Sequence, residues 1–104
     1  MTYELKYDEK FQLYLHKKIK GERSVQYLFR FDNGYGASVV KNLFSYGRNQ
    51  DLWELAVISW PEEGDMFKIV YDIRSITMDV VGWLNDDDVN VLLEKIMQLN
   101  GWGK

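Results

Sequence analysis

The run Asp86-Asp87-Asp88 is the densest group of carboxylates in the chain, and carboxylates are the side chains that bind hard divalent cations. A calcium loop places its oxygen ligands at alternating positions, with a central glycine and a distal bidentate glutamate. Here a helical pattern begins at once, so that ligand spacing is missing. Acidic residues are also favoured in the first turn of a helix, where they meet the positive end of its dipole. We therefore predict that the aspartates cap a helix and that the protein holds no metal ion or other cofactor.

The residue types needed for nucleophilic catalysis are sparse. His16 is the only histidine, and its neighbours Lys17 and Lys18 indicate an exposed position. No serine has the flanking glycines of a nucleophile elbow, and the absence of cysteine excludes a thiol nucleophile, disulfides and thiolate metal sites. The segment Gly34-Tyr35-Gly36 lacks the third glycine of a nucleotide-binding motif and opens a strand where that motif needs a helix. We predict that the protein is not an enzyme.

Basic residues gather in one short stretch of the chain, at Lys17, Lys18, Lys20 and Arg23. Such a patch can contact phosphates or an acidic protein surface, or simply remain solvated. The formal net charge of the whole chain is −3, which is too small to mark a nucleic-acid binder. We therefore disfavour nucleic acid as the partner.

The four tryptophans are too many for the centre of so small a core, and tryptophan, tyrosine and arginine are enriched in interaction hot spots. Trp53 and Trp60 are seven positions apart, so as strand residues they face opposite sides of a sheet. At least one of them should lie outside a helix-covered core, under other cover or available to a partner. Packing is an equally weighted alternative for each aromatic residue. The predicted partner-contact residues are Tyr35, Tyr46, Arg48, Trp53, Trp60, Lys17 and Lys18.

Length and composition place these residues in one ordinary domain. The chain has 104 residues, of which 46% are hydrophobic and 15% aromatic, so we expect a single domain over 1–104 with a real core. No apolar stretch approaches the roughly 20 residues of a membrane span, and the first ten residues lack the basic start and apolar core of a signal peptide. We expect a soluble, intracellular protein with no membrane association.

The centre of the chain predicts a tight hairpin followed by a buried strand. Residues 24–31 alternate between apolar and polar, with Leu28 as the exception, and Asn33-Gly34 before another apolar run is a strong hairpin signal. Residues 37–40 form the return strand. The run 52–60 is apolar enough for a central strand, and residues 67–73 follow a turn and alternate again. These segments predict a four-stranded antiparallel meander.

The two ends of the chain are expected to add helices, which gives an α+β fold. The four-residue spacing of Phe11, Leu15 and Ile19 favours a helix over 9–20, although Phe11, Leu13 and Leu15 also alternate, and residues 20–23 could instead close a first hairpin. We assign no secondary structure to residues 78–84. The clearest helix covers 86–99, with Asn85 or Asp86 as its cap, a stop at 100–101 and one apolar face to pack on the sheet.

Four motifs, NGYGASVV, the YG of Tyr46-Gly47, LWELAV and VVGWL before the last helix, resemble a group of small proteins encoded by tailed bacteriophages and prophages. The resemblance covers residues 27–99, contains no active-site motif and leaves out the basic patch. Proteins of this group mostly have no assigned function, so the resemblance carries over no catalytic residue. It implies that the protein acts in the cytoplasm of an infected bacterium.

We expect a phage accessory protein that binds a bacterial or phage protein and inhibits a host or defence protein. One alternative is a virion or assembly component that self-associates as a homo-oligomer through exposed edge strands. A second alternative is a small-ligand binder with a pocket between sheet and helix, lined by Tyr27, Tyr71 or Trp83.

Overall fold

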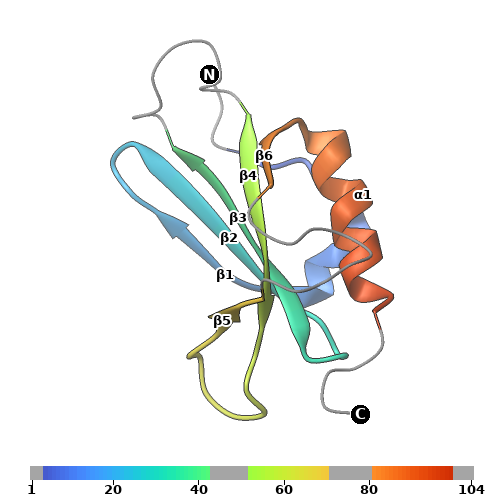
Figure 1. Ribbon diagram of the computed structural model, residues 1–104. Coiled ribbons are helices and arrows are strands. Elements are labelled where there is room, and N and C mark those ends of the chain that lie inside the picture. Colours follow the sequence, from blue (N-terminus) through green and yellow to red (C-terminus); the bar gives the residue numbers. More distant parts are fainter. Residues whose placement is uncertain (1–3, 43–51, 71–80, 100–104) are drawn as a thin grey trace.

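A computed structural model describes residues 4–42, 52–70 and 81–99, which form an antiparallel sheet with one helix across one face (Figure 1). The strands run in the order β1-β2-β3-β4-β5. Strand β6 also pairs with β4, at a different position along it from β5. The elements are the 3-10 helix η1 (Glu9–Tyr14), β1 (Leu15–Lys20), β2 (Ser24–Arg30), β3 (Tyr35–Asn42), β4 (Trp53–Ser59), β5 (Lys68–Ile69), β6 (Val81–Leu84) and α1 (Asp86–Met97).

The predicted α+β class and the antiparallel meander are confirmed, but the number of strands is not. The structure adds β1 before the predicted hairpin, and β6 within the stretch that received no assignment. The strand predicted for residues 67–73 is present as β5 at Lys68–Ile69, and residues 71–73 lie outside the described residues. Both β5 and β6 pair with β4, at different positions along it.

The helix predicted over residues 9–20 is wrong beyond Tyr14. Only the first half is helical, as η1, and residues 15–20 form β1, so the alternative of a first hairpin is the correct one. The backbone N–H of Gly21 donates to the carbonyl of Ser24 at 2.9 Å and closes that hairpin. The helical spacing misled because Phe11 is fully buried while Ile19 is 41% exposed, so the two do not share a buried face. Pairing with β2 satisfies alternate backbone groups of β1 and completes the pairing of β2, which outweighs local propensity.

Helix α1 and the inner face of the sheet enclose the main core. Side chains at alternate positions of β2, β3 and β4 point toward the helix, which contacts β3, β4 and β6. The fully buried aromatic and aliphatic side chains of this core include Phe11, Phe29, Val39, Leu55, Val89, Leu93 and Ile96. Lys41 is also buried on this side, with its Nζ 4.5 Å from the centre of the Trp53 ring. A cation over an indole face is stabilised by the ring quadrupole, which helps to keep this charge inside.

The amino-terminal segment is fastened to α1 by polar contacts. The side chain of Asn90 accepts from the backbone N–H of Asp8 at 2.7 Å and donates to the carbonyl of Lys6 at 2.8 Å. Lys10 forms an ion pair with Glu94, and this hydrogen-bonded ammonium lowers the pKa of the Glu94 carboxyl below its ordinary value. The residues before β1 are therefore held against α1.

Both ends of α1 are capped. The side chain of Asn85 accepts from the backbone N–H of Asp88 at 2.8 Å, and the Asp88 carboxylate accepts from the N–H of Asn85 at 3.1 Å, which confirms the predicted cap as a capping box. At the other end the side-chain amide of Asn33 donates to the carbonyls of Ile96, Met97 and Leu99 at 2.8, 3.2 and 3.0 Å. The β2–β3 turn therefore supplies donors to carbonyls that have no partner within the helix. The predicted stop at 100–101 lies outside the described residues.

Gly34 has a φ of 89°, as expected for the hairpin turn. We predict that Gly34→Val lowers the free energy of unfolding by about 1 kcal/mol or more, because a β-branched residue is strained at positive φ. Chemical denaturation followed by circular dichroism measures the loss. Gly34→Asn is the control, since asparagine reaches positive φ more readily and should cost less. Equal losses for the two variants would show that the positive φ of Gly34 is not the reason why the turn needs glycine.

None of the helices in the described part of the chain has the length and apolar character needed to cross a lipid bilayer.

Candidate functional site

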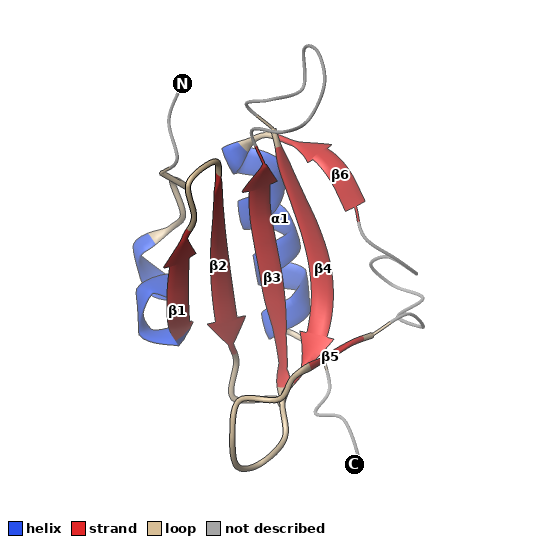
Figure 2. Ribbon diagram, turned by 90° about the vertical axis from the view of Figure 1, so that its left-hand side faces the viewer, coloured by secondary structure: helices blue, strands red, loops and turns tan. Residues whose placement is uncertain are grey.

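The face of the sheet turned away from α1, here called the outward face, carries a second and smaller core at one end. Figure 2 shows that no described helix lies over this face. Leu28, Ile58 and Trp60 are buried there, and Phe67 packs against them. Leu28 is the residue that broke the alternation expected for its strand, and its place in this second core explains the exception.

Trp60 is the centre of this second core. Its indole Nε1 donates to the carbonyl of Phe29 at 2.9 Å, and its ring centre lies 5.2 Å from that of Phe67 and 4.7 Å from that of His16. The Arg30 guanidinium carbon lies 5.0 Å from the same ring. An aromatic, an imidazole and a cation therefore surround one indole, which leaves the Trp60 side chain only 2% exposed.

Arg30 fixes the turn that follows β4. Its guanidinium donates to the carbonyls of Pro61, Gly64 and Glu62 at 2.6, 3.0 and 3.4 Å. Three backbone acceptors occupy donors that would otherwise be available to a carboxylate or phosphate ligand. We therefore assign Arg30 a structural role in holding residues 60–65 over the outward face.

His16 assists Arg30 from the neighbouring strand. It lies at a bulge in β1, where the pairing with β2 shifts between Leu15 and Lys17, and its Nε2 is 3.0 Å from Oδ1 of Asp65. The extra residue of a bulge re-aims a side chain, here toward Trp60 and the turn. We call His16 and Arg30 together with residues 60–65 the turn clamp. No sequence pattern indicates the clamp apart from the isolated histidine and arginine themselves.

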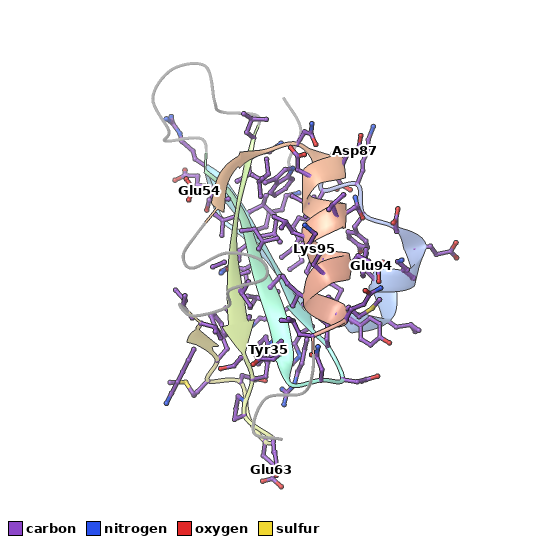
Figure 3. All side chains as sticks on the ribbon, turned by 45° about the vertical axis from the view of Figure 1, so that its right-hand side comes forward. Tyr35, Glu54, Glu63, Asp87, Glu94 and Lys95 are labelled. Atoms are coloured by element: carbon purple, nitrogen blue, oxygen red, sulfur yellow. The ribbon has the colours of Figure 1, made fainter. Side chains whose placement is uncertain are left out.

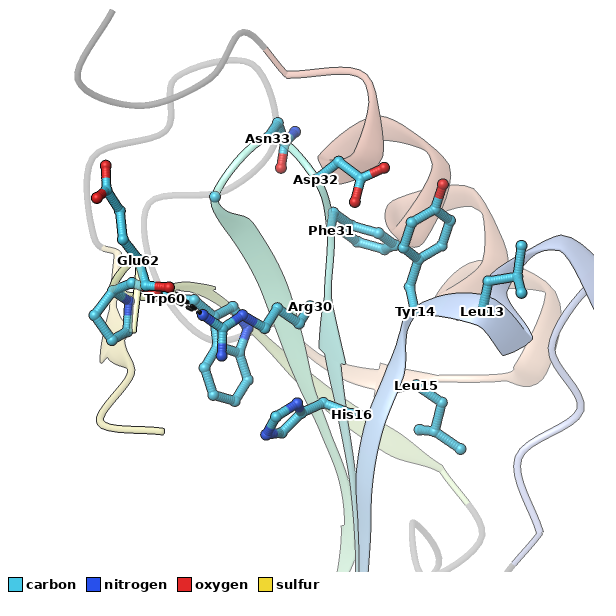
Figure 4. A pocket seen from close by; sticks show the side chains of 12 residues that line it. Leu13, Tyr14, Leu15, His16, Arg30, Phe31, Asp32, Asn33, Trp60 and Glu62 are labelled. Atoms are coloured by element: carbon cyan, nitrogen blue, oxygen red, sulfur yellow. Dashed lines mark hydrogen bonds between the residues drawn. The ribbon is translucent and has the colours of Figure 1, made fainter. Parts of the chain in front are cut away.

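An open depression of about 780 Å³ lies beside the turn clamp (Figure 4). Tyr14, Asn33 and Glu62 line it together with His16 and Arg30. Its two basic side chains are held by the turn, as described above, so the depression does not present a free cation. Among the described residues no group of histidine, aspartate and glutamate side chains could hold a metal ion.

This depression is not the pocket predicted between sheet and helix. Tyr27, which was expected to line that pocket, is 3% exposed in the main core, where its ring packs against Trp53. Tyr71 lies outside the described residues, and the side chain of Trp83 is likewise outside them.

The tryptophans predicted to contact a partner are buried. Trp53 is 1% exposed and belongs to the main core, where its Nε1 donates to Oδ1 of Asp86 at 3.0 Å. Trp60 belongs to the second core. The two therefore face opposite sides of the sheet, as predicted from their spacing, and the packing alternative describes both.

The other predicted contact residues have different fates. Tyr35 is half-buried against the main core at one end of the sheet (Figure 3), and Tyr46 and Arg48 lie outside the described residues. Lys17 and Lys18 are both exposed on β1. A hydrogen bond to Tyr27 raises the pKa of Lys18, so Lys18 remains charged at neutral pH. Of the predicted residues that the structure describes, only the two lysines lie together on an accessible strand.

Beyond the second core, the outward face is exposed at Glu54, Lys17 and Ile19, half-buried at Gln26, and buried at Ser38. Glu54 projects from β4 on the side away from α1 (Figure 3), and Gln26 donates to Ser38 Oγ at 2.8 Å across β2 and β3. Lys17 and Ile19 of β1 are exposed on the same face. The surface that remains for a partner is therefore made of these exposed positions of the outward face and the adjoining strand β1.

Gly36 is required by the close approach of Trp60. A Cβ atom at Gly36 would collide with the carbonyl oxygen of Phe29 and lie 2.5 Å from the Trp60 Nε1. We predict that Gly36→Ala destabilises the protein by about 1–3 kcal/mol or more, because backbone of a central strand must shift. Thermal unfolding checks this, with Gly64→Ala as a comparison where no atom lies within 4 Å and any cost comes from the positive φ of 92° and not from a collision. A melting temperature unchanged by Gly36→Ala would contradict the packing of Trp60 described above.

Comparison with protein families, with curated proteins and with solved structures finds no match for this chain.

Proposed function

We propose that the protein is a non-enzymatic, phage-type accessory protein that binds a macromolecular partner in the bacterial cytoplasm and inhibits a host or defence protein. The observation that carries the proposal is that the described helices cover one face of the sheet and not the other. Helix α1 and η1 cover the inner face, while Glu54 on the outward face and residues 17–20 of β1 are exposed. The resemblance of residues 27–99 to phage proteins supplies the biological setting.

An interface of standard size is within reach of a domain of 104 residues. A stable protein interface buries about 800 Å² on each partner, which one sheet face and an adjoining edge of a small domain can provide. Glu54, Gln26, Lys17 and Ile19 offer acidic, neutral, basic and apolar contacts on the same side of the sheet. Occlusion of a partner's working surface requires no catalytic group, so such a surface is sufficient for inhibition.

Affinity capture from bacterial lysate tests the proposal. The tagged full-length protein is incubated with lysate treated with nuclease, and the retained proteins are identified by mass spectrometry. We expect a single host protein at a stoichiometric level, and we expect the purified protein to inhibit that target's activity in a direct assay. Recovery of the protein alone, with an oligomeric mass in light scattering, would contradict the proposal and favour an assembly component.

A further inference from the structure

The sheet has two very different edges. Along β4, the strand β5 pairs with Ile58 and Ser59 and the strand β6 pairs with Trp53 and Leu55, so this side is closed at both ends. At the opposite side β1 is the last strand, and no strand of the described residues pairs with its outer edge (Figure 2). An unpaired edge strand presents backbone donors and acceptors that can pair with another chain.

The register of the β1–β2 hairpin identifies which backbone groups point outward. In an antiparallel pair, residues alternate between those that bond to the partner strand and those that point away from it. Gly21 bonds to Ser24, so Ile19 and Lys17 also bond to β2, and the backbone N–H and C=O of Lys18 and Lys20 point away. These two sets of groups are about 7 Å apart, the repeat of an extended strand.

The charge of this edge selects the kind of chain that can pair with it. Residues 15–23 contain Lys17, Lys18, Lys20 and Arg23 against one acid, Glu22, in a chain whose formal net charge is −3. Two copies paired through β1 would place lysines opposite lysines, and like charges directly opposite each other destabilise a strand pair. The edge is therefore protected against self-association and is complementary to acidic side chains.

We infer that the outer edge of β1 accepts an extended, acidic segment of a partner protein as an added strand. This inference rests on the proposed function and names the surface and the partner's chemistry. Backbone bonds to Lys18 and Lys20 provide affinity, and acidic residues beside these lysines provide selectivity. An apolar residue on the opposite face of the added strand lies beside Ile19, which is 41% exposed.

A peptide fits this edge better than a nucleic acid does. Outward N–H and C=O groups in alternation match another peptide backbone, whereas a phosphate backbone offers acceptors only. The Nζ of Lys18 lies 3.4 Å from Oε1 of Glu4, so a carboxylate is already a neighbour of one of these cations. An added strand in which acidic and apolar residues alternate would contact both the lysines of β1 and the exposed Ile19.

Nuclear magnetic resonance of the full chain tests the inference with a synthetic probe. The probe is an extended peptide of alternating glutamate and valine, about eight residues long. We expect its addition to slow the amide hydrogen exchange of Lys18 and Lys20 and to shift the resonances of β1. An alternating lysine and valine peptide and an oligothymidine of similar length are the controls. Changes confined to the depression or to α1, or tighter binding of the oligothymidine, would overturn the inference.

Variants separate the backbone contribution from the charge. Lys20→Pro removes an outward N–H at an edge position where proline is tolerated, and Lys20→Ala removes the charge alone. We expect Lys20→Pro to weaken peptide binding up to roughly tenfold relative to Lys20→Ala, the equivalent of one backbone hydrogen bond. The pair Lys17→Glu/Lys20→Glu should weaken it further, and Lys95→Glu on the exposed face of α1 should not.

The same variants distinguish this inference from the proposed function. If the wild type captures a host protein and Lys17→Glu/Lys20→Glu captures it equally well, the edge is not the contact surface and the proposed function still holds. If the wild type captures no partner while the peptide binds β1 as described, the edge accepts acidic strands and the proposed inhibitory function fails. Equal affinity of the probe for the wild type and all three β1 variants would overturn the assignment of β1.

Discussion

Trp60→Ala is expected to lower the free energy of unfolding by about 3–5 kcal/mol, the usual loss for a large buried aromatic residue. The substitution empties the centre of the second core, where Trp60 is 2% exposed and contacts His16, Arg30 and Phe67. It also leaves the Phe29 carbonyl without the indole donor at 2.9 Å. A small domain has only about 5–15 kcal/mol of stability, so this loss is a large share of the total. Urea denaturation followed by fluorescence of the remaining tryptophans measures the loss.

Trp60→Phe separates packing from hydrogen bonding, because phenylalanine keeps an aromatic ring and lacks the indole N–H. We expect it to cost less than Trp60→Ala. Met66→Ala serves as the matched control in the same turn, since Met66 is 86% exposed and should contribute little. A loss for Trp60→Ala no greater than that for Met66→Ala would show that the outward face has no second core.

Leu93→Ala is expected to cost about 2–5 kcal/mol. Leu93 is fully buried between α1 and the sheet, in the same cluster as Phe29, Val39 and Leu55. Its truncation leaves a cavity at the centre of the main core, where neighbouring side chains come from several elements and cannot collapse together. Chemical denaturation monitored by circular dichroism gives the difference from the wild type.

Val91 provides the matched control for this prediction. It lies on the same helix, two positions away, and is 55% exposed. Val91→Ala should change the free energy of unfolding by less than about 0.5 kcal/mol, as most surface substitutions do. Similar losses at both positions would mean that α1 does not pack on the sheet through the face that contains Leu93.

The central part of the fold could be predicted from local patterns. Asn33-Gly34 marks a turn because glycine reaches positive φ at low cost, and the continuous apolar run of β4 marks a strand covered on both faces. The capping box at Asn85 and the apolar face of α1 are also local signals, contained within one element. These features follow from short-range sequence because their physical causes are short-range.

The features that could not be predicted depend on distant residues. Residues 15–20 fit a helix and a strand about equally, and pairing with β2 decides between them. Trp60 looked like a candidate for partner contact because its burial depends on His16 and Arg30, which reach it from two other strands. The accessible lysines of β1 could be named from sequence, whereas their position at the free edge of a sheet required the strand order.

The hydrogen bonds from Asn33 to the end of α1 have a consequence for the order of folding. They join residues 63, 64 and 66 positions apart, so the carboxyl end of the helix gains its donors only after most of the chain has been brought together. Contacts of such high sequence separation slow folding, because the loop must close before they form. The last turn of α1 should therefore be among the final parts to become protected from exchange during refolding. The hairpin and the helix then reach full stability in a single cooperative step.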